Sequence, residues 1–185
     1  QGEVVEADYH IIHGIKTRLQ NTIRCVREIP LTVEEVVFSP IAAAQVMLSR
    51  EHKDRGALLI DIGGGVTDYV MYSGGSVAQS GCVGVGGDHI TNDISVVMKI
   101  PITRAEKLKV EHGGVLIEES VSDSVILEDD PLSSSFEIDK EMLNQIINAR
   151  ATELFEQLKE RITKHDDLNT LGAGVFLTGG ASKLK

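Results

Sequence analysis

Apolar residues recur along this chain with two spacings, and these spacings predict an alternation of strands and helices. Short apolar runs, which are typical of strands, occupy 4–12, 33–38, 57–60, 69–72, 76–83 and 173–178. Apolar residues three or four positions apart, which mark one face of a helix, occupy 15–29, 41–48, 103–112 and 142–163. Between 115 and 138 the pattern is looser and predicts two or three short strands at an exposed edge. Strands that alternate with helices in this way indicate an α/β fold.

Polar residues and prolines predict where several of these helices begin. Ser39, followed by Pro40, is expected to cap the helix that comes next. The sequence Thr-Arg-Ala-Glu at 103–106 fits a capping box, and Asp139 is expected to cap the long helix near the end of the chain. The charged segment 50–56 is expected to form a solvent-exposed turn.

The clearest local pattern is a strand, a glycine turn and a second strand. The apolar run 57–60 ends at Asp61, the glycines at 63–65 follow, and a second strand begins at Thr67. Because this turn carries almost no side chains, the two strands are expected to pair as an antiparallel hairpin. The strand over 76–83 follows another glycine turn, so the whole segment is expected to form a three-stranded antiparallel meander.

The glycine turn of this hairpin has the composition of a phosphate-binding loop. Gly63, Gly64 and Gly65 expose backbone N–H groups that no side chain shields, and such groups form a nest for anions. A carboxylate beside phosphate oxygens is repulsive unless a cation lies between them, so Asp61 predicts a bound Mg²⁺, held through water. Thr67 is expected to donate its hydroxyl to a phosphate oxygen or to orient a water. The alternative is a plain turn with no ligand, and the residues flanking the glycines favour phosphate.

The turn does not match the two commonest phosphate-binding fingerprints. The chain lacks the Gly-x-x-x-x-Gly-Lys-Ser/Thr sequence of a P-loop. Its glycines join two strands rather than a strand and a helix, which excludes the dinucleotide-binding fingerprint. Two other glycine pairs are further candidates. The pair 86–87 precedes a helix, whose first N–H groups are expected to be free and to favour an anion. The pair 179–180 follows a strand and lets the backbone approach a ligand closely. Each of these pairs alone is more simply a turn.

Composition and charge narrow the class of ligand. The 185 residues carry a formal net charge of −10, whereas binding to nucleic acid without sequence preference needs a basic surface. Aromatic residues make up 4% of the chain and tryptophan is absent, which argues against a platform on which single-stranded bases stack. We therefore expect no nucleic-acid partner. No apolar run approaches the ~20 residues that a membrane-spanning helix needs.

Taken together, the glycine motifs and their order resemble the second half of the actin and heat-shock-chaperone ATPases, in which two halves of a ribonuclease H-like fold clamp a nucleotide. Within this superfamily the chain is most similar to the FtsA family of bacterial cell-division proteins. The residues that carry the resemblance are 61–68, 85–94, 105–109 and 177–181. The run from Gly86 to Ile94 is the most specific to FtsA, because the hairpin alone is common to the superfamily.

The resemblance covers nearly the whole chain and implies an α/β, actin-like ATPase fold: the second half together with the end of the first half. It also implies a division of the chain into segments. These are 1–32, the end of a subdomain peculiar to FtsA; 33–55, the tail of the first half; 56–95, the nucleotide-binding part of the second half with the phosphate hairpin; 96–172, a small inserted subdomain; and 173–185, a return to the second half with the adenosine motif.

The same resemblance implies a site for ATP and Mg²⁺ and assigns no catalytic residue. The implied contacts are Gly63, Gly64, Gly65 and Thr67 at the phosphates, Asp61 near Mg²⁺, Gly86 and Gly87 near the terminal phosphate, Glu106 and Lys109 beside the ribose and adenine, and Gly179, Gly180 and Ala181 along the adenosine. Glu106 and Lys109 are three residues apart, which places both on one face of a helix.

Two departures from the family pattern bear on activity. The first phosphate loop, which the family carries near its N-terminus, is absent from this chain, so this segment alone is expected to bind nucleotide poorly. Relatives that hydrolyse ATP briskly carry Glu or Gln where this chain has Ser39, and a serine is a poor base or water-positioner. We expect at most a weak ATPase, in which nucleotide acts mainly as a conformational ligand.

The resemblance further implies partners and a location. It predicts binding to FtsZ, self-association into filaments, and attachment to the membrane through a C-terminal helix that lies outside this chain. The implied location is cytoplasmic, peripheral on the inner face of the cell membrane at the division site. The FtsZ tail is expected to dock on the small subdomain, roughly 94–169, with Lys140, Arg150 and Lys159 as candidate basic contacts.

Other members of the superfamily are alternatives. A chaperone-type ATPase would need a peptide-binding domain and the Glu that Ser39 replaces. A sugar or acetate kinase would need a carboxylate base in the first half, which this chain does not show. An actin-like scaffold of pilus assembly shares the hairpin, and the run that begins at Gly86 disfavours it.

Overall fold

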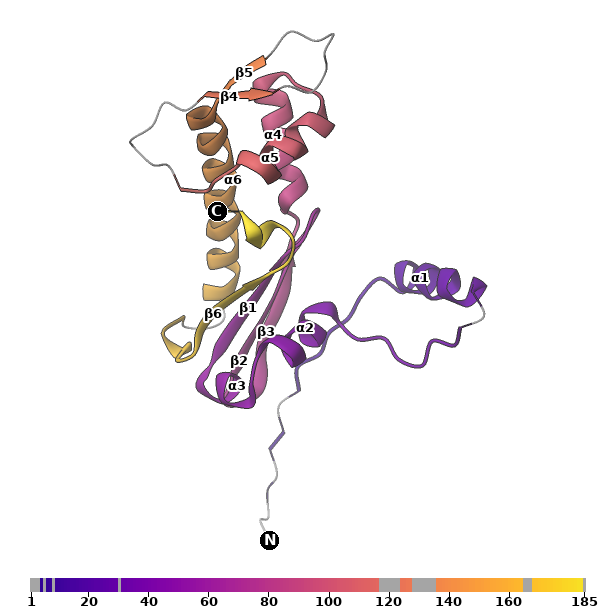
Figure 1. Ribbon diagram of the computed structural model, residues 1–185. Helices are drawn as coiled ribbons and strands as arrows, with labels where there is room; N and C mark the ends of the chain where they lie inside the picture. Colours follow the sequence, from indigo (N-terminus) through magenta and orange to yellow (C-terminus); the bar gives the residue numbers. More distant parts are fainter. Residues whose placement is uncertain are drawn as a thin grey trace.

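A computed structural model describes residues 4, 6–7, 9–29, 31–116, 124–127, 136–164 and 168–184 of the chain (Figure 1). It contains both helices and strands, as the apolar spacing predicts. In chain order the elements are α1 (Lys16–Glu28), α2 (Ser39–Met47), α3 (Arg50–Arg55), β1 (Ala57–Ile62), β2 (Thr67–Ser73), β3 (Ser76–Val83), α4 (Gly87–Met98), α5 (Ile102–His112), β4 (Ser124–Leu127), β5 (Phe136–Asp139), α6 (Lys140–Thr163), the 3₁₀ turn η1 (Leu168–Thr170), β6 (Gly174–Thr178) and the 3₁₀ turn η2 (Ala181–Lys183).

The centre of the structure is a mixed four-stranded sheet with the strand order β3-β2-β1-β6. β1 pairs with β2, and β2 with β3, in antiparallel register, so the expected hairpin and meander are confirmed. β6 returns from the end of the chain and pairs with β1 in parallel. Its return brings Thr178 beside Asp61, which in turn lies opposite Asp68. The glycine turn and the end of β6 therefore meet at one end of the sheet.

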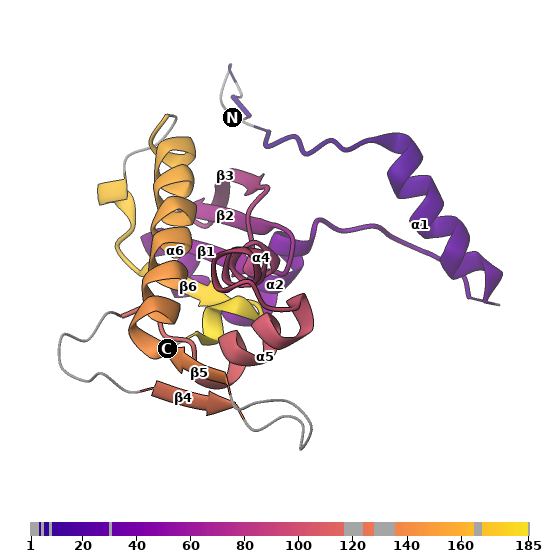
Figure 2. The ribbon, with the colours of Figure 1, turned by 90° about the horizontal axis from the view of Figure 1, so that it is seen from above.

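Side chains alternate between the two faces of the sheet, and a helix covers each face (Figure 2). On one face, Ile60 of β1 belongs to a buried cluster with Leu154 and Leu158 of α6. On the other face, Leu59 belongs to a buried cluster with Ala44 of α2. The small Ala44 side chain is 0% exposed and lets α2 lie close to the strands. Each fully buried leucine of this kind stabilises the fold by about 1.5–3 kcal/mol.

A second, smaller core lies beyond the end of the sheet, among α4, α5, the first half of α6 and the antiparallel β4–β5 pair (Figure 1). Ile94 of α4, Leu108 of α5 and Leu143 of α6 are 0% exposed within it. Further along α6, Leu154 packs into the core of the sheet instead. One helix of 24 residues, about 36 Å long, thus contributes to both cores.

Two of the expected strands are not formed. The described residues of 4–12 and the segment 31–38 have no regular structure, although their residues suit a strand. A strand is stable only where neighbouring strands take up its backbone hydrogen bonds, and neither segment joins the sheet, whose edges are β3 and β6. The helix expected over 15–29 is present as α1, but none of its residues is buried, and it stands apart from the sheet (Figure 1).

Prolines, not side-chain caps, begin two of the helices. The expected cap at Asp139 is confirmed, because its carboxylate accepts hydrogen bonds from the N–H groups of Glu141 (2.9 Å) and Met142 (3.3 Å). The other two expected caps are wrong. α2 already begins at Ser39, and α5 follows Pro101, in both cases without a side-chain cap. A proline in or before the first turn already fixes the φ angle that a helix needs.

The segment 50–56 is largely exposed, as its charges suggest, but it contains the short helix α3 rather than a turn. The Ser49 hydroxyl accepts a hydrogen bond from His52 N–H (3.2 Å), and Ser49 N–H donates to His52 Nδ1 (3.3 Å). This reciprocal pair is a capping box in which histidine takes the place of the usual Glu or Gln. A search for Ser followed by Glu three residues later passes over it.

The last strand is less buried than its apolar run suggests. Val175 is 54% and Leu177 is 46% exposed, because β6 is an edge strand of the sheet. Of the short strands expected before α6, β4 and β5 are present. Residues 115–116 are not in a strand, and Ile117 lies outside the described residues.

Candidate functional site

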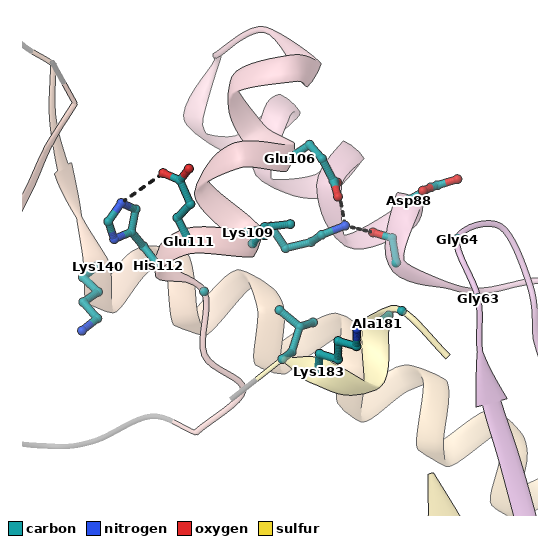
Figure 3. A pocket seen from close by; sticks show the side chains of 15 residues that line it. Gly63, Gly64, Asp88, Glu106, Lys109, Glu111, His112, Lys140, Ala181 and Lys183 are labelled. Atoms are coloured by element: carbon teal, nitrogen blue, oxygen red, sulfur yellow. Dashed lines mark hydrogen bonds and ion pairs between the residues drawn. The ribbon is translucent and has the colours of Figure 1, made fainter. Parts of the chain in front are cut away.

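A cleft of about 530 Å³ opens where the glycine turn, the start of α4, α5 and the end of the chain meet (Figure 3). This volume lies within the range of sites for small-molecule ligands and cofactors. The residues predicted from the sequence that line the cleft are Gly63, Gly64, Gly87, Glu106, Lys109, Gly180 and Ala181. The other predicted residues, which do not line it, are Asp61, Gly65, Thr67, Gly86 and Gly179.

The glycine turn presents free backbone donors beside this cleft. A hydrogen bond from Gly63 N–H to Val66 O (3.0 Å) closes the turn. Gly64 and Gly65 are exposed, and within the described part of the chain neither of their N–H groups donates a hydrogen bond. Two neighbouring unpaired N–H groups are the donors that an anion nest requires. The N–H groups of these two glycines are therefore available to an anion.

The start of α4 is docked on the turn. Gly87 N–H donates to Gly63 O (2.9 Å), and Asp88 N–H donates to Gly64 O (2.8 Å). Gly86 N–H is taken up within the first turn of the same helix. The first N–H groups of the helix are therefore not free, contrary to expectation, because that of Gly87 joins the helix to the turn and that of Gly86 binds His89 Nδ1.

Thr67 is directed into the protein. It is 0% exposed, and its hydroxyl donates to Val85 O (2.8 Å). This bond ties the start of β2 to the segment that leads into α4. A hydroxyl has one proton to donate, so we do not propose Thr67 as a phosphate ligand.

Glu106 and Lys109 lie on one face of α5, as their spacing predicts, and point toward each other (Figure 3). Lys109 Nζ lies 2.6 Å from Glu106 Oε2, and the Lys109 side chain is 8% exposed while that of Glu106 is 49% exposed. Glu106 also accepts a hydrogen bond from the Thr91 hydroxyl. The carboxylate thus reaches the cleft, while the ammonium group is turned inward.

The surroundings of Glu106 lower its pKa. Burial acts to raise the pKa, but the hydrogen bonds from Lys109 and Thr91, together with the positive charge of Lys109, lower it by more. The carboxylate is therefore ionised at neutral pH and acts only as a hydrogen-bond acceptor. An acceptor of this kind suits the hydroxyl groups of a ligand.

We expect the Glu106 carboxylate to stabilise the fold at neutral pH and to lose that contribution in acid. Its pKa is lower in the folded than in the unfolded protein, so the unfolded state binds the proton more readily. Stability therefore falls as the pH drops below the ordinary pKa of 4.5 toward the lowered one. Urea unfolding of the wild type and of Glu106→Gln, between about pH 7 and about pH 3, should show a difference in unfolding free energy that shrinks in acid. A difference that stays constant over this range would contradict the prediction.

A second polar cluster lies on the face of the sheet that α2 covers. Asp61 and Asp68 are opposite each other on β1 and β2, and the Ser39 hydroxyl donates to Asp68 (3.4 Å). Burial raises the pKa of Asp68, the hydrogen bond from Ser39 lowers it, the charge of Asp61 raises it, and the net change is upward. Facing carboxylates repel each other unless a cation lies between them, and a hard cation prefers such oxygen ligands. The described residues hold no cluster of three or more His, Cys, Asp or Glu side chains that would bind a metal.

Sequence reasoning missed several charged residues of the cleft. Asp88, Lys140 and Lys183 line it together with the predicted residues. Asp88 directly follows the glycine pair, so its position was a usable signal. Lys140 begins α6 and Lys183 lies in η2, and no local pattern connects these two lysines with a turn so far away in the sequence.

Comparison with known proteins identifies the family. The family model described as cell division protein FtsA matches residues 58–185. The FtsA of Borreliella burgdorferi is 36% identical over 96% of this chain and 44% of its own length. The FtsA of Neisseria meningitidis is 30% identical over 99% of this chain and 45% of its own length. The chain thus spans less than half the length of these curated relatives.

Solved structures establish the fold. The crystal structure of MreB5 of Spiroplasma citri bound to ADP matches with a TM-score of 0.77 at 19% identity, over 93% of this chain and 56% of that one. The PilM–PilN type IV pilus biogenesis complex matches with a TM-score of 0.65 at 18% identity, over 90% and 42%. Ta0583, an archaeal actin homologue, matches with a TM-score of 0.52 at 13% identity, over 79% and 41%.

At these identities the structures show a shared fold only, and the pilus protein is as consistent with it as the others. The family model distinguishes FtsA from these other proteins of the same fold. Its match covers the sheet, the cleft and the small core. The chain has the expected α/β, actin-like ATPase fold, and it belongs to the FtsA family of cell division proteins.

Proposed function

We propose that this chain is the nucleotide-binding part of a cell-division protein that binds ATP with Mg²⁺, assembles into filaments and links FtsZ polymers to the cytoplasmic membrane. The observation that carries the proposal is the cleft of about 530 Å³ in a chain of the FtsA family. An exposed glycine turn and an ionised carboxylate lie at this cleft. The division into subdomains given above is part of the same proposal.

The contacts support a nucleotide with its phosphates at the turn. The N–H groups of Gly64 and Gly65 would bind phosphate oxygens, and the Glu106 carboxylate would accept hydrogen bonds from ribose hydroxyls. Gly180 and Ala181 have small side chains, so the backbone can pass close to the nucleoside there. MreB5, which shares the fold, was crystallised with ADP. Gly63 and Gly87 would form part of the same surface, and Gly86 and Gly179 would support it from behind.

The pair of facing carboxylates fits a divalent cation. Asp61 would hold Mg²⁺ through water, and Asp68 would provide a second carboxylate opposite it. When bound, Mg²⁺ would neutralise part of the phosphate charge. Burial contributes most to the raised pKa of Asp68, and the charge of Asp61 adds to it. A cation between the two carboxylates would favour their ionised forms and so oppose this rise.

We expect hydrolysis to be slow. The Ser39 hydroxyl donates to Asp68, so the short side chain at the position where brisk relatives carry Glu or Gln is already engaged within the protein. Nucleotide would then act by shifting the balance between conformations.

The segment 96–172, the small subdomain of the proposal, offers one site for an acidic, apolar peptide such as the expected FtsZ tail. Of the three candidate cations, Arg150 is held by Asp93 and Glu153, and Lys140 faces the nucleotide cleft. Lys159 instead borders a hollow of about 310 Å³ on α6, whose lining includes Phe155. Phe155 is 41% exposed, so an apolar anchor and a cation lie side by side there.

Filaments and membrane attachment complete the proposal. The protein would act on the cytoplasmic side, peripheral on the inner face of the cell membrane at the division site, through a C-terminal helix of the kind that the FtsA resemblance implies. Among the described helices, none combines the length and the apolarity needed to cross a bilayer.

The test is co-sedimentation of the protein with FtsZ polymers, with and without MgATP. We expect the protein to pellet with FtsZ and the bound fraction to change when nucleotide is added. Lys159→Glu is expected to weaken pelleting by about three- to tenfold, because it places a negative charge beside an acidic tail. Lys164→Glu makes the same charge change just past the end of α6, where Lys164 pairs with Glu160 (3.0 Å), and it should pellet like the wild type.

The outcomes separate the parts of the proposal. Protein that stays in the supernatant under all conditions would overturn the division role and leave the fold assignment intact. Equal pelleting of Lys159→Glu and Lys164→Glu would move the FtsZ contact away from the hollow on α6. Pelleting that does not respond to MgATP would show that nucleotide does not control the contact.

A further inference from the structure

The ammonium group of Lys109 makes all of its hydrogen bonds within the protein, which leaves none for a ligand. Its side chain is 8% exposed although it lines the cleft. Its Nζ atom lies within hydrogen-bond distance of Gly87 O (3.0 Å), Thr91 Oγ1 (2.7 Å) and Glu106 Oε2 (2.6 Å). An ammonium group has three N–H donors and no acceptor. The three protein acceptors therefore use every donor that Lys109 has.

Two of these acceptors belong to the first two turns of α4. Gly87 begins the helix, and Thr91 is one turn further on, where it is 4% exposed. Lys109 comes from α5, so its ammonium group joins the two helices at the end of α4 that faces the cleft. The Glu106 carboxylate completes the cluster from the cleft side (Figure 3).

The same end of α4 carries the glycine turn. The N–H groups of Gly87 and Asp88 donate to the carbonyl groups of Gly63 and Gly64. A continuous set of hydrogen bonds therefore runs from Lys109 through the start of α4 to the turn. If the start of α4 moves, the carbonyl groups of the turn lose their donors, and the N–H groups of the turn change direction.

We propose that Lys109 is a positioning residue that holds the start of α4, and through it the glycine turn, in the geometry that phosphate binding requires. This differs from the direct contact with ribose or adenine that the family resemblance implies for the same lysine. The inference rests on the proposed function for what the turn binds. We call the hydrogen bonds from Lys109 to Gly87 and Thr91 the Lys109 clamp. This clamp is present in the protein without ligand, so it can be tested separately.

The first test is amide hydrogen exchange of the protein without nucleotide, for the wild type and Lys109→Met. Methionine keeps an unbranched side chain of similar length and removes the charge. We expect the Gly87 and Asp88 amides to exchange about tenfold faster in the variant, because the charged hydrogen bonds that fix their helix turn are lost. The amides of Leu59 and Val70, in the centre of the sheet, should exchange at the wild-type rate.

A matched pair of variants at Thr91 checks the clamp from the side away from the ligand. Thr91 is not among the residues that line the cleft, so a ligand-contact role for Lys109 predicts no effect there. Thr91→Val removes the hydroxyl and keeps the shape, and it should speed exchange at Gly87 as Lys109→Met does. Thr91→Ser keeps the hydroxyl and should restore the wild-type rate.

The second test compares ligands with and without a nucleoside. If Lys109 positions the turn, Lys109→Met should weaken binding of MgATP and of magnesium tripolyphosphate by the same factor, about tenfold. If Lys109 contacts the nucleoside, only MgATP binding should weaken. If the wild-type protein binds neither ligand, the proposed function is overturned. The amide hydrogen exchange rates would still test the clamp, because they are measured without ligand. Unchanged exchange at Gly87 and Asp88, or an equal increase in Leu59 and Val70, would overturn the clamp.

Discussion

Gly179→Ala is expected to destabilise the protein by about 3–5 kcal/mol, the largest effect of any single methyl group that we predict. Two independent causes add. Gly179 has φ of +91°, where a residue with a side chain is strained, and a Cβ atom there would lie 2.4 Å from Ile62 O and 2.5 Å from Asp61 Oδ1. The contact with Ile62 O cannot be relieved cheaply, because it is to the backbone of β1. The contact with Asp61 Oδ1 further requires that the Asp61 side chain turn away. Urea unfolding followed by circular dichroism measures the change.

Two glycines next to this position provide matched controls. Gly174, at the start of β6, has φ of +87° with no atom within 4 Å of an added Cβ, so Gly174→Ala should cost only the conformational part, about 1–2 kcal/mol. Gly180 has φ of −64° and open space, so Gly180→Ala should lie within about 1 kcal/mol of the wild type or stabilise it slightly. If Gly179→Ala and Gly174→Ala cost the same, the close approach of β6 to β1 does not matter energetically.

Gly86→Ala is expected to cost about 3 kcal/mol for a purely steric reason. Gly86 has φ of −160°, which any residue adopts, but a Cβ atom there would lie 2.4 Å from Gly64 O and 2.6 Å from Gly63 O. The methyl group would push the start of α4 off the glycine turn and break the two hydrogen bonds between them. We therefore expect binding of MgATP to weaken at least tenfold as well, measured by isothermal titration calorimetry.

Gly84→Ala is the control for this variant. Gly84 lies two residues earlier, is exposed, and has no atom within 4 Å of an added Cβ. It should leave both stability and nucleotide binding at the wild-type level. If Gly86→Ala is as stable as the wild type, α4 and the turn can separate without a loss of free energy. The close packing of α4 on the turn would then not stabilise the protein.

Local patterns were sufficient to predict the centre of the fold. The run 57–60, the three glycines and the strand that follows predict the β1–β2 hairpin, because each residue acts through its immediate neighbours. Asp139 predicts its cap for the same reason. The spacing of Glu106 and Lys109 predicts that they face each other, since a helix brings residues three apart onto one side.

Features that depend on distant parts of the chain could not be predicted in this way. Whether 33–38 forms a strand depends on a partner strand that the local sequence does not reveal. The inward direction of Lys109 depends on Gly87 and Thr91, which lie 22 and 18 residues away. The N–H groups at the start of α4 were expected to be free, because a sequence shows which groups exist but not which distant carbonyl groups accept from them.

The shared helix α6 fixes how the length of this chain can change. Its buried residues Leu143, Ile147, Ala151, Leu154, Leu158 and Ile162 form one unbroken stripe, of which the first part faces the small core and the last part faces the sheet. Inserting one residue in the middle would rotate one end by about 100° relative to the other and turn one of the two apolar surfaces toward solvent. Insertions or deletions of about seven residues return the stripe to within about 20° but shift one core along the helix by about 10 Å, which the docking of α4 on the glycine turn does not permit. Natural length variation in this part of the protein should therefore occur in the loops outside α6.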